Sequence, residues 1–218
     1  MFPSLFMAAL VATSVTAVSD PSSFNCDPPR SAPSSVCYVP DCTRRIAHHI
    51  QEELNAAFSY LYMAAHFDDD RIARHGLAKF LYESASEERQ HAILMLEYLN
   101  KRGVLFNETY NLKTSDNEVF LPASCNEYRS LTIPIKTIKF LSQHQVTNSI
   151  YKIVEACGLD FHAADVFTDP ILDEQHEGIR KLQGAIRTFK DMTDGHTHTS
   201  AGAMAEFMFD QKILANGL

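Results

Sequence analysis

The stretch that decides the fold covers residues 50–63 and reads IQEELNAAFSYLYM. Apolar residues recur through it at helical spacing, and no Gly or Pro interrupts the chain between Thr43 and Gly76. Glu53 and Tyr60 are seven residues apart, so their side chains share one face of a helix, beside the apolar stripe. We therefore predict a long helix over residues 43–69 that carries polar groups next to its buried face.

Further helical patterns follow along the chain. The second runs from Leu77 to Tyr98 and ends at Gly103, a typical C-terminal capping residue. The third begins at Pro134, which suits a first helical turn, and the fourth contains Pro170, either at its start or at a kink. Residues 202–214 predict a short fifth helix, and no segment has a convincing strand pattern.

The connection between the second and third helices is long. Residues 104–130 show no clear period and contain Pro122 and Cys125. Such a loop is unusual in a compact domain, and a crossover that returns the chain along a helical bundle explains it. The expected fold is all-α: a four-helix bundle with one long crossover and a short fifth helix.

The N-terminal residues indicate export. Residues 1–17 are apolar, uncharged and end in a small-x-small pattern, which is typical of a signal peptide; the alternative is an ordinary buried helix. We expect a signal peptide over 1–17, a Cys- and Pro-containing extension over 18–42, and a helical domain over 43–218. In a secreted chain, Asn107 begins a glycosylation sequon. The cysteines Cys26, Cys37 and Cys42 are expected to form at least one disulfide, within or between subunits.

Charge and hydropathy exclude two classes of partner. The chain has 19 Lys and Arg against 27 Asp and Glu, a net charge of −8, which argues against a nucleic-acid binder. After the leader, no segment is apolar for long enough to cross a bilayer. We expect neither nucleic acid nor membrane as a partner.

Several polar residues fall on faces that should be buried: Glu53 and Tyr60 on the first helix, Glu87 and His91 on the second, Gln143 on the third, and Gln175 on the fourth. An unpaired buried carboxylate costs several kcal/mol, and no Lys or Arg shares these faces. A bound iron or similar divalent ion would neutralise the carboxylates. The alternatives are a solvated helix face for residues 87–91, a core aromatic for Tyr60, and surface positions for His48 and His49.

From Cys42 to Leu214 the chain resembles a ferritin subunit. The resemblance is carried by four segments in order: IQEELNAAFSYLYM, FLYESASEERQHA, ILDEQHEGI and GAMAEFMFDQKIL. With its leader, sequon and cysteines, the chain is similar to a secreted invertebrate ferritin. The resemblance implies a homo- or hetero-oligomeric cage around a ferric mineral, with Fe(II) and dioxygen as substrates of a di-iron centre.

Position by position, the resemblance implies roles at that centre. The first iron would be held by Glu53, Glu87 and His91, with Glu87 bridging to the second iron. Other matching positions near the centre are Tyr60, Glu88 and Gln175. Catalytic ferritin subunits usually carry Glu where this chain has Gln143, so the second iron loses an anionic ligand. The acidic channel through which iron enters is partly matched by Asp165 and Asp169.

The resulting functional expectation is a secreted ferroxidase that stores the ferric product. The alternative function is that of a non-catalytic cage or carrier subunit. In that case Gln143 has disabled oxidation, and a partner subunit oxidises the iron. A di-iron oxidase acting on an organic substrate shares the bundle but would not need the fifth helix.

Overall fold

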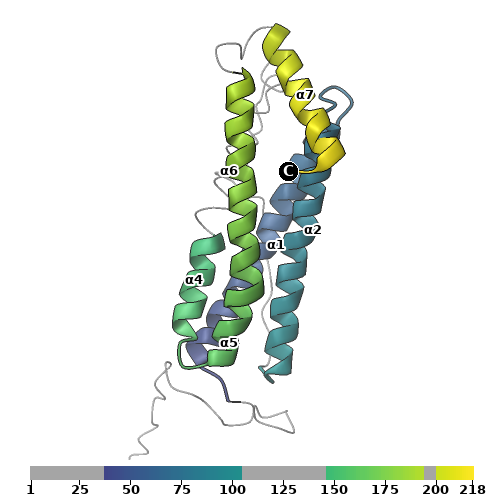
Figure 1. Ribbon diagram of the computed structural model, residues 1–218. Coiled ribbons are helices and arrows are strands. Elements are labelled where there is room, and N and C mark those ends of the chain that lie inside the picture. The colour runs from purple at the N-terminus through teal and green to yellow at the C-terminus, as the bar shows by residue number, and fades with distance from the viewer. Residues whose placement is uncertain (1–36, 105–145, 194–199) are drawn as a thin grey trace, which may run out of the picture.

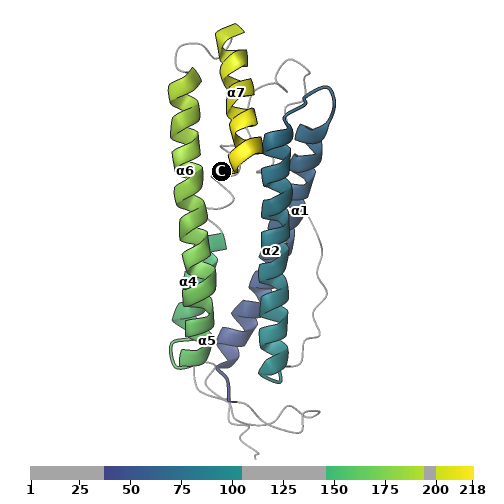
Figure 2. The same cartoon turned by 45° about the vertical axis from the view of Figure 1, so that its right-hand side comes forward.

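The structure is a computed structural model that describes residues 37–104, 146–193 and 200–218. Its elements are α1 (Pro40–Asp68), α2 (His75–Lys101), α4 (Thr147–Ala156), α5 (Phe161–Val166), the π-helix η2 (Phe167–Leu172), α6 (Asp173–Thr193) and α7 (Ser200–Asn216). Helices α1 and α2 form an antiparallel pair, α4 and α6 lie on the other side, and α7 caps one end (Figures 1 and 2). The predicted all-α fold is confirmed.

The ends of α1 and α2 follow from local chemistry. Pro40 occupies the first turn of α1, where its missing N–H is harmless, so the helix begins three residues before the expected Thr43. Helix α2 ends at Lys101, and Gly103 follows with a φ of 69°, the left-handed conformation that glycine tolerates best. The second helix therefore stops where the sequence predicted.

Pro170 lies inside a helix rather than at its start. It falls within η2, which runs from α5 directly into α6. Because proline lacks an N–H and crowds the preceding turn, the regular α-helical hydrogen bonds cannot continue through it, and a wider turn absorbs the defect. Of the two alternatives left open by the sequence, the structure supports an interruption within the fourth helix.

The fifth helix is attached to the start of α2 by polar contacts. The buried carboxylate of Asp210 on α7 accepts hydrogen bonds from the backbone N–H of Gly76 (3.2 Å) and Leu77 (2.9 Å). The two helices approach so closely that a Cβ on Gly76 would lie 2.0 Å from the carbonyl oxygen of Asp210. Glycine is therefore needed at this position, and α7 supplies the anion that a helix N-terminus favours.

A disulfide joins the beginning of α1 to the residue after α4. Cys42 and Cys157 are both fully buried, are separated by 115 residues, and have Cα atoms 4.7 Å apart. Cys37 is also disulfide-bonded. The N-terminal cysteine cluster thus does form a bridge, but its partner is Cys157, which the sequence left isolated.

Removing this bridge should destabilise the chain. We expect Cys42→Ala combined with Cys157→Ala to lower the free energy of unfolding by about 2–4 kcal/mol, because the unfolded chain gains freedom over a long loop. Denaturant unfolding followed by circular dichroism measures the change. Either single variant should behave like the double one, and unchanged midpoints would contradict the prediction.

A buried ion pair closes the same end of the bundle. Both terminal nitrogens of the Arg102 guanidinium, Nη1 and Nη2, contact the Asp160 carboxylate, at 3.0 Å and 2.5 Å. The guanidinium also donates to the hydroxyl of Tyr98 and to the carbonyl of Cys37. Asp160 in turn caps α5 by accepting from the backbone N–H of Ala163 at 3.2 Å. The buried guanidinium of Arg102 therefore joins the end of α2 to the start of α5.

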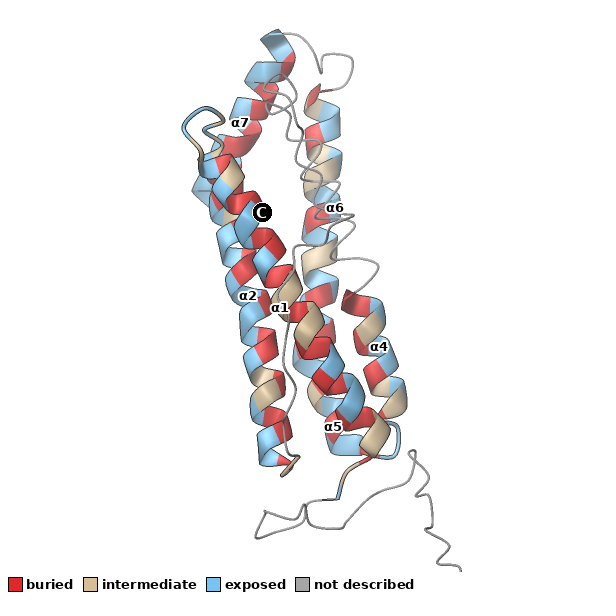
Figure 3. Cartoon of the chain, turned by 180° about the vertical axis from the view of Figure 1, so that it is seen from behind, coloured by how far each residue is buried: buried red, intermediate tan, exposed pale blue. Residues whose placement is uncertain are grey.

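The apolar core has two parts, and α1 and α2 contribute to both. Buried residues recur along the length of both helices (Figure 3). One part lies near the disulfide and includes Ile46, Ile50, Met95, Leu99, Ile150 and Phe167. The other lies near α7 and includes Met63, Phe67, Leu77, Leu81, Phe189 and Phe209. Along α1 and α2, the buried polar residues Glu53, Glu88 and His91 fall between these two parts.

Some expectations concern residues that the structure does not describe. These are the leader over 1–17, the extension over 18–36 with Cys26, and the connection over 105–130 with the sequon at Asn107. The start of the third helix at Pro134 and the site residue Gln143 also lie outside the described residues. They remain predictions. In the described part of the chain, no helix has the length and hydropathy required to span a bilayer.

Candidate metal centre

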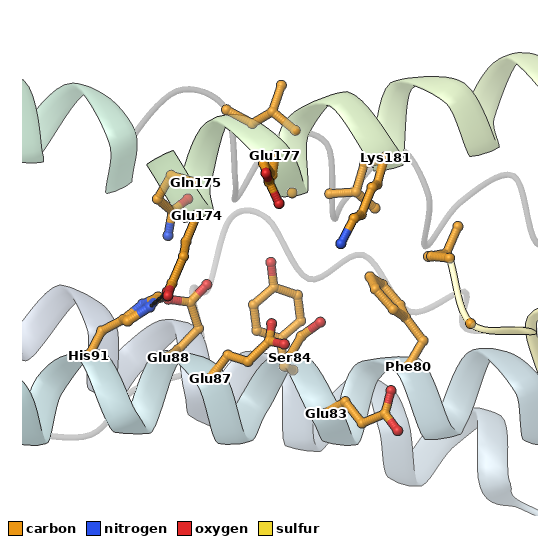
Figure 4. Close-up of a pocket in the computed structure, with 16 residues that line it drawn as sticks. Phe80, Glu83, Ser84, Glu87, Glu88, His91, Glu174, Gln175, Glu177 and Lys181 are labelled. Atoms are coloured by element: carbon orange, nitrogen blue, oxygen red, sulfur yellow. Dashed lines mark hydrogen bonds and ion pairs between the residues drawn. The ribbon is translucent and has the colours of Figure 1, made fainter. Parts of the chain in front are cut away.

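Two carboxylates and an imidazole meet between α1 and α2. Ligand atoms of Glu53, Glu88 and His91 all lie within 4.8 Å of one another. Glu53 is fully buried, and Glu88 and His91 are 8% and 9% exposed. Glu88 and His91 are three residues apart, so they share the face of α2 that is turned toward α1. Figure 4 shows both side chains directed from α2 into the interior.

Electrostatics at this group favour a cation. Burial, together with the charge of Glu53, raises the pKa of Glu88 to about 8. Burial also opposes ionisation of Glu53, but contacts with His49 and Glu88 hold its pKa below the usual value. Neither carboxylate oxygen of Glu53 completes a well-aligned hydrogen bond. Two carboxylates are therefore buried side by side, and a divalent cation between them would offset the charge of both.

The two nitrogens of His91 face different groups. Nδ1 lies 3.3 Å from Glu88 Oε2, on the side of the ligand group, whereas Nε2 lies 3.0 Å from Glu174 Oε2 on α6. Burial alone would lower the pKa of His91, but the nearby carboxylates raise it to about 10. A carboxylate behind a histidine is the usual device for orienting a metal-binding imidazole. With Nε2 turned toward Glu174, Nδ1 is the nitrogen that faces Glu88.

The helical pattern of the sequence does not by itself predict the contribution of Glu174. The sequence feature that pointed to Glu174 was its position immediately before Gln175. Both residues lie in the first turn of α6, on the side that faces α2 (Figure 4). Gln175 is itself buried and lines the same cavity, which has a volume of about 530 Å³. Tyr60 is buried in the cavity wall, and burial together with Glu88 and Glu53 raises the pKa of its phenol.

The structure differs from the expectation for Glu87. That residue lines the cavity but is exposed and does not belong to the group formed by Glu53, Glu88 and His91. Adjacent residues point about 100° apart around a helix, so Glu87 and Glu88 cannot both face α1 equally. Within the described residues, it is Glu88 that lies together with Glu53 and His91. Gln143 lies outside the described residues.

The expected surface position of His49 is wrong, because its ring is completely buried. Nδ1 lies 2.6 Å from Glu52 Oε2, and Nε2 lies 2.9 Å from Glu53 Oε1. Burial alone would lower the pKa of His49, but these two carboxylates raise it to about 9. Its neighbour His48 is exposed, as expected.

The two aspartates assigned to a channel are exposed. Asp165 lies on α5 and Asp169 on η2, one turn further along. They do not belong to the buried group formed by Glu53, Glu88 and His91. A channel between subunits would need neighbouring chains, so this assignment remains a prediction.

Comparison with known proteins identifies the fold family. Residues 44–192 match the family model of the ferritin-like domain. The chain belongs to the ferritin family. Ferritins bind iron, so iron is the metal to consider at Glu53, Glu88 and His91.

Individual relatives agree with this assignment. The chain is 33% identical over 178 residues to a ferritin heavy chain from Trichoplusia ni, with 79% of each chain covered. It is 34% identical over 173 residues to a ferritin heavy chain from Aedes aegypti, covering 78% of this chain and 77% of that one. The crystal structure of Trichoplusia ni secreted ferritin superposes with a TM-score of 0.71 at 30% identity, covering 89% of this ferritin and 98% of the other chain.

Proposed function

We propose that this ferritin binds Fe(II) at the group formed by Glu53, Glu88 and His91, oxidises it with dioxygen, and stores the ferric product inside an oligomeric cage. The proposal rests on two buried carboxylates and an imidazole whose ligand atoms all lie within 4.8 Å of one another. Such oxygen and nitrogen donors suit iron, and the carboxylate charges favour the ferric product. Two Fe(II) ions each give one electron to dioxygen, which takes up two protons from water and leaves as hydrogen peroxide, so both ions must be held close together.

Each residue has a distinct part in this proposal. Glu53 on α1 and the Nδ1 of His91 on α2 bind one iron between these two neighbouring helices. Glu88 lies between them, so its second oxygen is available to the other iron. Tyr60 and Gln175 line the cavity beside it, where the second iron and dioxygen would be accommodated.

The test follows oxidation and assembly together. Purified protein is mixed with Fe(II) in air, ferric absorbance is recorded, and the particle is sized before and after loading. We expect ferric absorbance to grow faster than in buffer and the iron to elute with a large oligomer. Iron that oxidises no faster than in buffer would contradict the enzymatic part, and a monomeric particle would contradict the cage.

A ferroxidase-poor subunit that relies on a partner chain is the second candidate, favoured by Gln143 standing where catalytic subunits carry Glu. Replacing a carboxylate with an amide removes one negative charge near two cations. We expect Gln143→Glu to speed Fe(II) oxidation, measured by stopped-flow absorbance. Gln145→Glu adds the same charge two residues further along the sequence and serves as the matched control, with a smaller expected change of rate. Equal rates for Gln143→Glu and the wild type would contradict the charge argument.

We also propose that the chain is exported, with its mature end near Val18 and a glycan on Asn107. The apolar leader and the sequon support this, and a secreted ferritin is among the similar structures. Mass spectrometry of material from the culture medium should find residues 1–17 removed and Asn107 modified. An intact Met1 would contradict the cleavage, and an unmodified Asn107 would contradict the glycan.

A further inference from the structure

The buried ring of His49 connects two carboxylates on one side of the metal centre. On α1, Glu52 and Glu53 follow His49 by three and four residues, so all three side chains lie on neighbouring parts of the helix surface. Nδ1 faces Glu52 at 2.6 Å, and Nε2 faces Glu53 at 2.9 Å. Both ring nitrogens are therefore already directed at carboxylates.

Glu52 is itself fixed from two helices. Its carboxylate is held on α1 by His49 and from α4 by a hydrogen bond with Ser149. The side chain is 33% exposed, so water can reach its outer edge. An anchored carboxylate on Nδ1 leaves the imidazole little freedom to rotate, and Nε2 stays directed at Glu53.

We propose that His49 is a positioning residue that orients the Glu53 carboxylate for the incoming cation, with Glu52 fixing the ring. This inference rests on the proposed function, because it concerns the same cation site. His49 is not itself placed as a ligand, since the ligand group consists of Glu53, Glu88 and His91. Its place behind Glu53 corresponds to the place of Glu174 behind His91 on the other side of the centre.

Simple packing would not require a histidine here. A leucine would occupy a similar volume, but it would leave Glu53 without its contact on α1 and free to turn away from the centre. Partners behind a metal ligand commonly contribute about 10–100-fold in metal affinity. A glutamine would keep one N–H toward Glu53 without the ring, so the two substitutions separate orientation from volume.

The experiment titrates the full-length protein, freed of iron, with Co(II) under nitrogen. The d–d absorption of Co(II) reports its coordination, and calorimetry reports affinity. We expect His49→Leu to weaken binding at the buried site by about 10–100-fold and to alter the d–d spectrum, and His49→Gln to stay within about 3-fold of the wild type. His75→Leu is the matched control, because His75 is exposed at the start of α2 and pairs with Asp68 instead.

Circular dichroism and particle size must match the wild type before the titrations are compared. If His49→Leu does not fold, Glu52→Ala is tested instead. This variant keeps the buried imidazole of His49 but removes the carboxylate that holds it, and weaker Co(II) binding would support the inference. Wild-type affinity and spectrum in His49→Leu, or in the deciding Glu52→Ala, would overturn it, as would a loss in His49→Gln equal to that in His49→Leu. Failure of both the wild type and His75→Leu to bind Co(II) would instead overturn the proposed site, and this inference with it.

Discussion

Glu88→Gln should lower the rate of Fe(II) oxidation by about 10–100-fold or more, whereas Glu87→Gln should change it by less than about 3-fold. The two residues are adjacent and chemically identical, but only Glu88 is buried against Glu53 and His91. Glutamine keeps the size of the side chain and removes the negative charge that would bridge two cations. Initial rates of ferric absorbance at equal subunit concentration measure the effect.

This pair of variants also tests the helical register. If Glu87→Gln proved the more damaging change, the assignment of the bridging position to Glu88 would be wrong, and the four-residue spacing between Glu87 and His91 would be the functional one. His91→Ala should abolish oxidation nearly completely in either case. Far-ultraviolet circular dichroism spectra that match the wild type would show that a variant has lost activity without unfolding.

Asp160→Ala should destabilise the subunit by about 3–5 kcal/mol, because it leaves the buried guanidinium of Arg102 without its counter-ion. The substitution also removes the cap of α5. Denaturant unfolding of the apo chain, followed by circular dichroism, measures the loss.

A double variant separates the ion pair from the volume of the side chain. Combining Asp160→Ala with Arg102→Met removes the stranded charge, and we expect it to recover part of the lost stability. Asp165→Ala, on the exposed side of α5, should stay within about 0.5 kcal/mol of the wild type. A loss below about 1 kcal/mol in Asp160→Ala itself would contradict the importance of the buried pair.

Helical periodicity predicted the helices, because apolar residues at regular spacing can be buried only along one face. The spacing could not choose between Glu87 and Glu88. Residues three and four positions before His91 both lie near it on a helix, and the contact with α1 decides which of them is buried. That contact is tertiary, so the sequence of α2 alone does not contain it.

The same limit explains His49 and Cys157. His48 and His49 are neighbours with the same chemistry, and only the packing of α1 against α2 and α4 buries the second ring. Cys157 lies 115 residues from Cys42, and pairing over such a distance depends on where α4 ends. Residue types predicted that a metal group and a disulfide exist, but not every residue that takes part.

The disulfide between Cys42 and Cys157 also turns the intervening chain into a closed covalent ring. A protease that cut one peptide bond anywhere between these residues would open the ring without dividing the molecule. The nicked chain would keep its full mass under non-reducing conditions and would separate into two pieces only after reduction. Most of α1, all of α2 and all of α4 lie within that ring. The helices that carry Glu53, Glu88 and His91 would therefore remain covalently joined after such a cut, as long as the surroundings stayed oxidising.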